Sequence, residues 1–232
     1  MSPEKRITKR QMKQDKLVST AFRVSEFVQQ QKKYFVIGAG VIIVAGLIIF
    51  FINYAVARKG QEATDLFGKA QLASAMGQPA LAKGDYKSII DQYESTSSAG
   101  RACYFYARTF YDESNCDSAL LYFEKYIDEF GKDKLLLRGA YLGAATCLED
   151  RGDNAGAGEY YFKAAVLAND ETFTPDYYMA SGRAYTDAGD YTEAEKAYQI
   201  VVDKYNKSPA FAMARKKLAE VQYKLNSADS TQ

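Results

Sequence analysis

The chain has 232 residues, enough for one or two domains, and its 30 lysines and arginines nearly balance its 29 aspartates and glutamates. The sequence contains no histidine, which excludes histidine bases, Ser-His-Asp triads and zinc sites with histidine ligands. Its three cysteines lack CxxC spacing and are too few for a disulfide framework. Composition therefore favours a protein whose function does not depend on histidine or zinc chemistry.

Residues 1–33 form a basic leader. This segment holds nine basic and three acidic residues, a net charge of +6, whereas the remainder holds 21 basic and 26 acidic residues, a net charge of −5. Phosphate recognition needs clustered Lys and Arg, so the acidic remainder is not expected to bind nucleic acid. Apolar residues between Leu17 and Val28 recur at helical spacing. The leader is therefore either an amphipathic helix on an anionic membrane surface or an ordinary topology signal.

Residues 34–57, YFVIGAGVIIVAGLIIFFINYAVA, lie between Lys33 and Arg58 and carry no charge. As an α-helix they would measure about 36 Å, enough to cross a hydrocarbon core of about 30 Å. A helix also satisfies its own backbone hydrogen bonds, which lipid cannot do. Tyr34 and Tyr54 lie near the two ends, where aromatic rings favour the membrane interface. We predict a transmembrane helix over 34–57.

The charges that flank this helix predict its orientation. Nine cationic residues precede it, whereas only Arg58, Lys59 and Lys69 follow closely. The positive-inside bias puts the leader in the cytoplasm and the rest of the chain outside it. The alternative is a signal peptide cleaved after Ala57, the last residue of an A-x-A pattern. The long leader and long apolar run favour an uncleaved signal anchor.

Residues 58–225 repeat one pattern of small and aromatic residues. Three alanines that each follow a turn, Ala119, Ala157 and Ala194, are separated by 38 and 37 residues. The three copies share the positions Cys103, Tyr106, Ala107, Phe110 and Phe123; Tyr141, Ala144, Ala145, Leu148 and Tyr161; and Tyr178, Ser181, Gly182, Tyr185 and Tyr198. A degenerate copy upstream is predicted to have its turn at Gly84-Asp85-Tyr86 and Ile89 at the alanine position.

This register resembles the tetratricopeptide repeat, a helix-turn-helix unit of about 34 residues. Small residues let two helices approach closely, and aromatic residues fill the gaps between neighbouring helices. Turn residues such as Asn115, Gly152 and Gly189 can take the left-handed backbone conformation that ends a helix. Because one helix pair cannot bury its own apolar face, the copies should stack. We predict an all-α fold: a transmembrane helix, then a solenoid of three clear repeats, one degenerate repeat and a C-terminal capping helix.

Two further boundaries follow from helix-breaking and helix-forming patterns. Pro79, two residues after Gly77, is expected to kink or split the helical segment 61–83. Residues 209–225 carry apolar side chains on one face and form the predicted capping helix. Residues 226–232, NSADSTQ, are predicted to be a disordered tail.

No phosphate-binding glycine loop, serine elbow or metal-ligand spacing occurs in the sequence. Five acidic residues lie close enough together in the sequence to suggest a carboxylate pair, but they fall at repeat turns, where solvated polar residues are expected. They are Glu149, Asp150, Asp153, Asp187 and Asp190. We therefore predict no catalytic residues, no metal site, no cofactor and no enzymatic activity.

The cysteines fall at three positions of the repeat pattern. Cys103 and Cys147 occupy first-helix packing positions, and Cys116 lies in a turn. The first two are expected to be buried thiols. A Cys103–Cys116 disulfide across one helix pair is the open alternative.

The inner, concave face of such a solenoid is lined by the first helix of each repeat. By repeat register the predicted partner-binding residues are Arg101, Tyr104, Arg108, Tyr111, Leu142, Thr146, Met179 and Arg183. Arginine mixed with aromatic and apolar groups suits an extended peptide or a partner helix, although an ordinary solvated surface would look the same. Repeats that clamp a C-terminal carboxylate use Lys and Asn where this chain has Tyr104 and Arg108, so that specialised mode is not expected.

The whole architecture resembles the YfgM-like family of bacterial inner-membrane proteins, ancillary subunits that accompany the Sec translocon. The resemblance covers roughly residues 25–225, including FVQQQKKYFVIGAG before and into the apolar run and the GDY turns. It implies a membrane-anchored scaffold that links translocon subunits to periplasmic chaperones or envelope assembly. The expected partners are proteins and the lipid bilayer, without nucleic acid or a small-molecule substrate. The alternative function is a regulatory or sensory protein that signals through its cytoplasmic leader.

Overall fold

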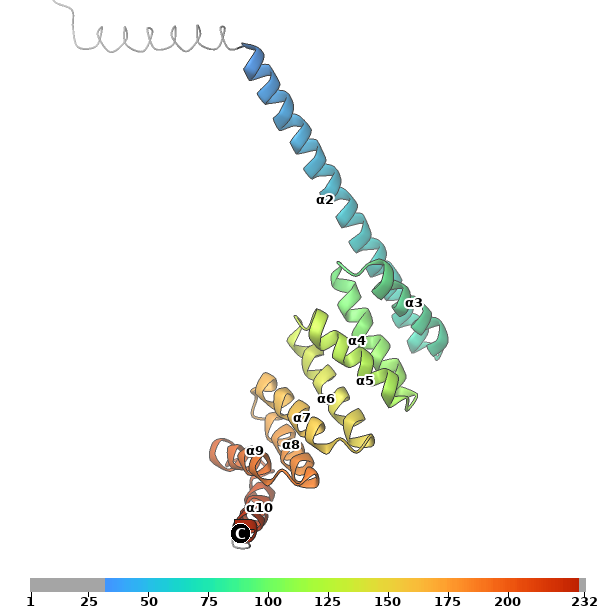
Figure 1. The fold of residues 1–232 in the computed structure, drawn as a ribbon. Helices are drawn as coiled ribbons and strands as arrows, with labels where there is room; N and C mark the ends of the chain where they lie inside the picture. Colours follow the sequence, from blue (N-terminus) through green and yellow to red (C-terminus); the bar gives the residue numbers. More distant parts are fainter. Residues whose placement is uncertain (1–31, 230–232) are drawn as a thin grey trace, which may run out of the picture. The chain divides into compact units, whose positions relative to one another are not determined.

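The computed structural model describes residues 32–229, which form nine α-helices and one π-helix and contain no strand. The predicted all-α class is therefore confirmed for this range (Figure 1). The helices are α2 (Lys32–Ala75), α3 (Pro79–Gln92), α4 (Ser97–Asp112), α5 (Cys116–Lys125), η1 (Tyr126–Phe130), α6 (Lys134–Asp150), α7 (Asn154–Ala168), α8 (Thr174–Ala188), α9 (Tyr191–Lys204) and α10 (Phe211–Asp229). Nearly all of the leader and the last three residues of the predicted tail lie outside the described residues.

The chain divides between Arg58 and Lys59 into two compact units. Helix α2 begins in the first unit and continues into the second, and it is the one helix of residues 32–229 that is long and apolar enough to cross a membrane, with a mean hydropathy of 3.0 over 18 residues. The predicted membrane segment ends at residue 57, whereas α2 continues to Ala75. Gly60 and Gly68 do not interrupt it, because an internal glycine weakens a helix without removing a backbone hydrogen bond.

The second unit is a stack of helix pairs, in which each helix from α3 to α10 packs against the next one along the chain (Figure 1). The pairs are α4 with α5, α6 with α7, and α8 with α9, and α10 packs against α9 at the C-terminal end. In a helical solenoid each repeat packs only against the repeats next to it, and the contacts of α4 with α5 and α6 follow this rule.

The alanine register predicted from the sequence is confirmed, and it extends one copy further upstream. In each of the second helices α3, α5, α7 and α9, a fully buried alanine lies four residues after the N-cap residue. A buried aromatic residue follows that alanine four positions later. The four pairs are Ala82 and Tyr86, Ala119 and Phe123, Ala157 and Tyr161, and Ala194 and Tyr198. A four-residue step places the alanine and the ring on one side of the second helix.

The fourth copy is present, but its predicted turn is misplaced. The residues Gly84-Asp85-Tyr86 lie inside α3, and the turn is instead at Gly77, whose φ is +72°. Pro79 splits the helical segment there as expected and starts α3, where its missing N–H leaves no hydrogen bond unmade. Ala82, and not Ile89, therefore holds the alanine position of this copy.

A left-handed residue ends the first helix of each pair, but at one turn it is not the residue predicted. Gly152 and Gly189 have φ values of +80° and +79°. In the first clear copy Ser114 takes this conformation, with φ 60°, whereas Asn115 has φ −92°. Asn115 instead caps α5, because its Oδ1 accepts a hydrogen bond from the Ser118 N–H at 3.1 Å. Asp153 and Asp190 cap α7 and α9 in the same way.

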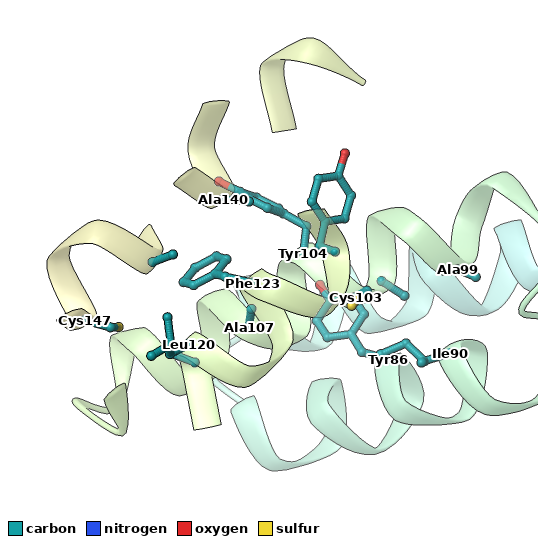
Figure 2. Packing of buried hydrophobic residues seen from close by; sticks show 14 of the residues in the cluster. Tyr86, Ile90, Ala99, Cys103, Tyr104, Ala107, Leu120, Phe123, Ala140 and Cys147 are labelled. Carbon is teal, nitrogen blue, oxygen red and sulfur yellow. The ribbon is translucent and has the colours of Figure 1, made fainter. Parts of the chain in front are cut away.

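Small residues at the helix crossings allow aromatic rings to lie directly against a neighbouring backbone. A Cβ atom on Gly182 would lie 2.6 Å from the Tyr198 ring, and one on Gly143 would lie 2.5 Å from the Phe123 ring. Figure 2 shows Phe123 and Tyr104 packed among the helices of this core. The expected packing of small residues against rings is therefore confirmed.

Two features of the helices differ from the prediction. The last turn after α5 is the π-helix η1, and Phe130 at its end lies against Gly100, where a Cβ atom would be 2.9 Å from the Phe130 Cβ. At the C-terminus the capping helix is confirmed, with Ala214, Leu218 and Val221 buried. It ends at Asp229, four residues into the segment predicted to be a disordered tail.

Candidate interaction surface

The first helices α4, α6 and α8 carry all eight predicted partner-binding residues. We call their shared side the first-helix face: Arg101, Tyr104, Arg108, Tyr111, Leu142, Thr146, Met179 and Arg183. The spacing on α4 is three, four and three residues, and on α6 and α8 it is four, so each set lies on one side of its helix. Arg101, Arg108 and Arg183 are exposed, Tyr111, Leu142, Thr146 and Met179 are partly exposed, and Tyr104 is buried.

Tyr104 is the one buried residue of this face. Its side chain is 8% exposed and contacts Gly139 on α6, where a Cβ atom would lie 2.5 Å from the Tyr104 hydroxyl. Its ring centroid is 5.9 Å from that of Phe123 and 5.8 Å from that of Tyr126 (Figure 2). The repeat register places Tyr104 on the first-helix face, but the glycine 35 residues later lets the next helix cover the ring.

Arg183 and Thr146 belong to one polar network that joins α6, α7 and α8. Arg183 Nη1 lies 2.9 Å from Glu149 Oε1, and Arg183 Nη2 donates to Glu149 Oε2 at 3.2 Å. The Tyr161 hydroxyl donates to Glu149 Oε2 at 3.0 Å and lies 3.3 Å from Thr146 Oγ1. Arg183 also lies 3.9 Å from Asp187, one turn further along α8.

Tyr161 and Arg183 both keep their protons at neutral pH. Burial is the main cause that raises the pKa of Tyr161 to about 12, so the phenol stays neutral. The hydrogen bond with Glu149 raises the pKa of Arg183 above its already high value. Sequence analysis did not include Glu149 or Tyr161 in the site, although Glu149 follows Thr146 by three residues on the same helix.

The other two arginines of the face have different surroundings. The Arg101 guanidinium lies 4.2 Å from the centroid of the Phe67 ring, a cation–π contact. Arg108 is 3.9 Å from Asp112, and both side chains are more than half exposed, so this pair contributes little to stability. Arg101 and Arg108 therefore keep their charges at the surface.

An open recess of about 560 Å³ lies beside Met179 and Arg183. Its remaining lining residues are Ala180, Thr186, Asp187, Tyr198, Met213 and Lys217. The recess combines thioether and aromatic groups with two cations and a carboxylate. Met213 and Lys217 come from α10, and the repeat pattern did not predict them because a capping helix has no following repeat to set its register.

The five clustered carboxylates have structural partners. Asp153 and Asp190 cap helices, Glu149 and Asp187 pair with Arg183, and Asp150 accepts a hydrogen bond from the Cys116 thiol at 3.1 Å. Among residues 32–229, no three potential metal-ligating side chains lie close enough to hold an ion. The surface therefore offers charge, apolar area and hydrogen-bonding groups for contact with another molecule.

The Cys103–Cys116 disulfide considered for this helix pair is not formed, since all three cysteines are free thiols. Cys103 is fully buried and its Sγ donates to the Tyr122 carbonyl at 3.4 Å. Cys147 is also fully buried, so the predicted packing roles of Cys103 and Cys147 are confirmed.

Helix pairs in register, with buried alanines against rings and a first-helix face left open, define a repeat solenoid of the tetratricopeptide type. The chain belongs to the tetratricopeptide repeat-like domain family, whose model matches residues 26–223. No curated protein matches the chain.

Solved structures share this fold at low sequence identity. A tetratricopeptide repeat protein from Parabacteroides merdae ATCC 43184 superposes with a TM-score of 0.55 at 15% identity, covering 72% of this chain and 62% of that one. The chain thus spans about three fifths of that protein's solved length. Nearly identical tetratricopeptide-like repeats of a putative kinesin light chain from Podosopora anserina superpose with a TM-score of 0.51 at 15% identity, covering 74% and 90%. These similarities are evidence for the fold alone.

Proposed function

We propose that the protein is a membrane-anchored, non-enzymatic scaffold that binds a partner protein on its first-helix face. Family membership supports this, because proteins built from these repeats typically act as protein-interaction modules. The observation that carries the proposal is the recess between α8 and α10, where Met179, Met213 and Tyr198 lie beside Arg183 and Lys217. Methionine, tyrosine and arginine are the residue types enriched at the centres of protein interfaces.

The composition of this surface suits a short, amphipathic segment of the partner. Apolar side chains of an extended peptide or a helix would enter the recess, while carboxylates on the same segment would reach Arg183 and Lys217. Thioether side chains adapt to differently shaped apolar groups, so Met179 and Met213 favour tolerance of several related sequences.

The location that we propose is the outer side of a bacterial inner membrane. The apolar part of α2 has the length and hydropathy of a transmembrane helix, and the basic leader before it favours a cytoplasmic N-terminus. The resemblance to the YfgM-like family then points to an accessory role at the Sec translocon, or in a periplasmic chaperone and envelope-assembly network. In that role the partner would be a translocon subunit or a chaperone.

Site-specific photo-crosslinking in intact membranes tests the binding surface. A photoreactive amino acid at Met213, which lines the recess, or at Arg108 of the first-helix face should capture one and the same protein, because both positions are exposed. Lys196 is an equally exposed charged residue on the second helix α9 and serves as the matched control. Capture from Lys196 but not from Met213 or Arg108 would exclude the first-helix face. A C-terminal tag that is accessible from the cytoplasm would exclude the proposed orientation.

A further inference from the structure

Two cysteines from neighbouring repeats meet where α5 begins and α6 nears its end. Cys116 is the first residue of α5, and Cys147 lies three residues before the end of α6. Each thiol is among the groups that shift the pKa of the other, which places the two side chains near one another. Cys116 Sγ also donates to Asp150 Oδ2 at 3.1 Å. Asp150 follows Cys147 by three residues, so α6 presents both side chains to Cys116 from the same side.

We propose that Cys116 and Cys147 form a disulfide site, which joins α5 covalently to α6 when the two thiols are oxidised. The third cysteine does not compete for either thiol. Cys103 is fully buried, and its Sγ is directed to the Tyr122 carbonyl of α5. Figure 2 shows Cys103 and Cys147 well apart on different helices. The pairing therefore links two successive repeats, instead of the two helices of one repeat.

The exposure of the two thiols sets the order of the reaction. Cys116 is partly exposed, whereas Cys147 is fully buried beneath it. An oxidant of the disulfide class, RSSR, can therefore reach Cys116 first. The Cys116 thiolate attacks one sulfur of RSSR, forming a Cys116–S–S–R mixed disulfide and releasing RS⁻. The Cys147 thiolate then attacks Cys116 Sγ and releases the second RS⁻. The two thiol protons pass to the two RS⁻ groups, and two electrons pass from the cysteine pair to the oxidant.

The local charges predict slow formation at neutral pH. Burial raises the pKa of Cys116 and raises the pKa of Cys147 to about 12, and the nearby carboxylates Asp150 and Asp117 act in the same direction. Arg151 lies 3.7 Å from Asp117 and offsets part of that negative charge. Since the thiolate is the attacking species, the reaction should accelerate as pH rises.

The disulfide would close the chain between residues 116 and 147. Such a loop restricts the unfolded chain, so the oxidised protein should resist heat better than the reduced one. It would also fix α6, which carries Leu142 and Thr146, against the preceding repeat. Any effect on partner binding rests on the proposed function, whereas formation of the disulfide does not.

Peptide mapping of the full-length protein in detergent micelles tests the pairing. The protein is incubated with oxidised glutathione at pH 8.5, free thiols are alkylated under denaturing conditions, and the chain is digested with trypsin. Residues 109–125 and 139–151 should appear as one disulfide-linked pair, whereas the peptide 102–108 should carry an alkylated Cys103. A link from Cys103 to either partner would overturn the proposal. So would a protein whose Cys116 stops at the glutathione adduct.

Thermal unfolding with and without the oxidant gives a second readout. Oxidation should raise the Tm of the wild-type protein by roughly 5–15 °C. Cys103→Ala should show the same rise, and Cys116→Ser should show none. Cys116 is the partly exposed member of the pair, so its replacement is the variant least disruptive to folding. An equal rise in Cys116→Ser would overturn the proposal, because the Cys116–Cys147 disulfide cannot form in that variant.

Discussion

Arg183 on α8 pairs with Glu149 on α6, 34 residues earlier, through contacts of 2.9 Å and 3.2 Å. The Glu149 side chain is 19% exposed, so the carboxylate depends on Arg183 and the Tyr161 hydroxyl for contacts that water would otherwise supply. The ion pair thereby connects two successive first helices on the surface that we propose to bind a partner.

Arg183→Ala should lower the free energy of unfolding by about 1–2 kcal/mol, because it leaves a mostly buried carboxylate with one partner fewer. Lys196→Ala is the matched control. Lys196 pairs with Glu193 one turn away on an exposed helix surface, and its removal should change stability by less than about 0.5 kcal/mol. Urea denaturation measures both values. Equal effects of the two substitutions would mean that the Arg183–Glu149 pair is no stronger than an ordinary surface pair.

Two glycine-to-alanine substitutions should have opposite signs. Gly182→Ala places a Cβ atom 2.6 Å from the Tyr198 ring at a buried helix crossing, and overpacking of this kind costs about 1–3 kcal/mol. Gly84→Ala adds a Cβ atom in open space inside α3 and should stabilise the protein by about 0.5–1 kcal/mol. Urea denaturation of both variants checks the signs. Stabilisation by Gly182→Ala would contradict the close approach of α8 and α9.

The turn before α5 carries strain that the equivalent turns avoid. Ser114 has φ 60°, at the position where the following two repeats have glycine. Non-glycine residues are disfavoured there by about 1–2 kcal/mol, so Ser114→Gly should raise the stability by up to about 1 kcal/mol. Gly152→Ser makes the reverse exchange in the next repeat and should lower stability by a similar amount. A matching loss from both substitutions would show that the backbone conformation of Ser114 carries no strain.

Much of the fold could be predicted from residue spacing, because small residues and rings must recur wherever two helices cross. The predicted turn of the upstream copy is misplaced because the residue types there resemble a turn that the repeat length puts elsewhere. Gly84-Asp85-Tyr86 resembles the turns of the later repeats, yet Gly77 and Pro79 supply the conformations that end one helix and start the next. The 37-residue distance from Ala82 to Ala119 was the more reliable signal, since it follows from the repeat length.

The first-helix face was less predictable, because its properties depend on contacts between repeats. Tyr104 is buried because Gly139, one repeat later, leaves room for its ring. Arg183 is held in place by its ion pair with Glu149, one repeat earlier. The helical pattern assigns a side of a helix to each residue, but it does not specify how far the next helix covers that side. The extent of this coverage depends on the sizes of the residues at which the two helices cross.

Stability should fall steeply above about pH 10. Burial, the main cause at each site, raises the pKa of Tyr126, Tyr160, Tyr161 and Tyr185 to about 12. The ordinary value of about 10 holds in the unfolded chain. Between these values the unfolded chain loses phenolic protons that the folded chain keeps, so the contribution is full below pH 10 and is lost as the pH rises toward 12.

Urea denaturation at several pH values between 8 and 11.5 measures how steeply the free energy of unfolding falls with pH. Tyr161→Phe should make this slope shallower by up to about 1.4 kcal/mol per pH unit. The Tyr161 side chain is 8% exposed, whereas that of Tyr223 is 76% exposed, which makes Tyr223→Phe the matched control. The control should leave the slope unchanged, because Tyr223 is mostly exposed in the folded protein and its replacement removes no buried phenol. If both variants had the wild-type slope, titration of Tyr161 would not contribute to alkaline unfolding.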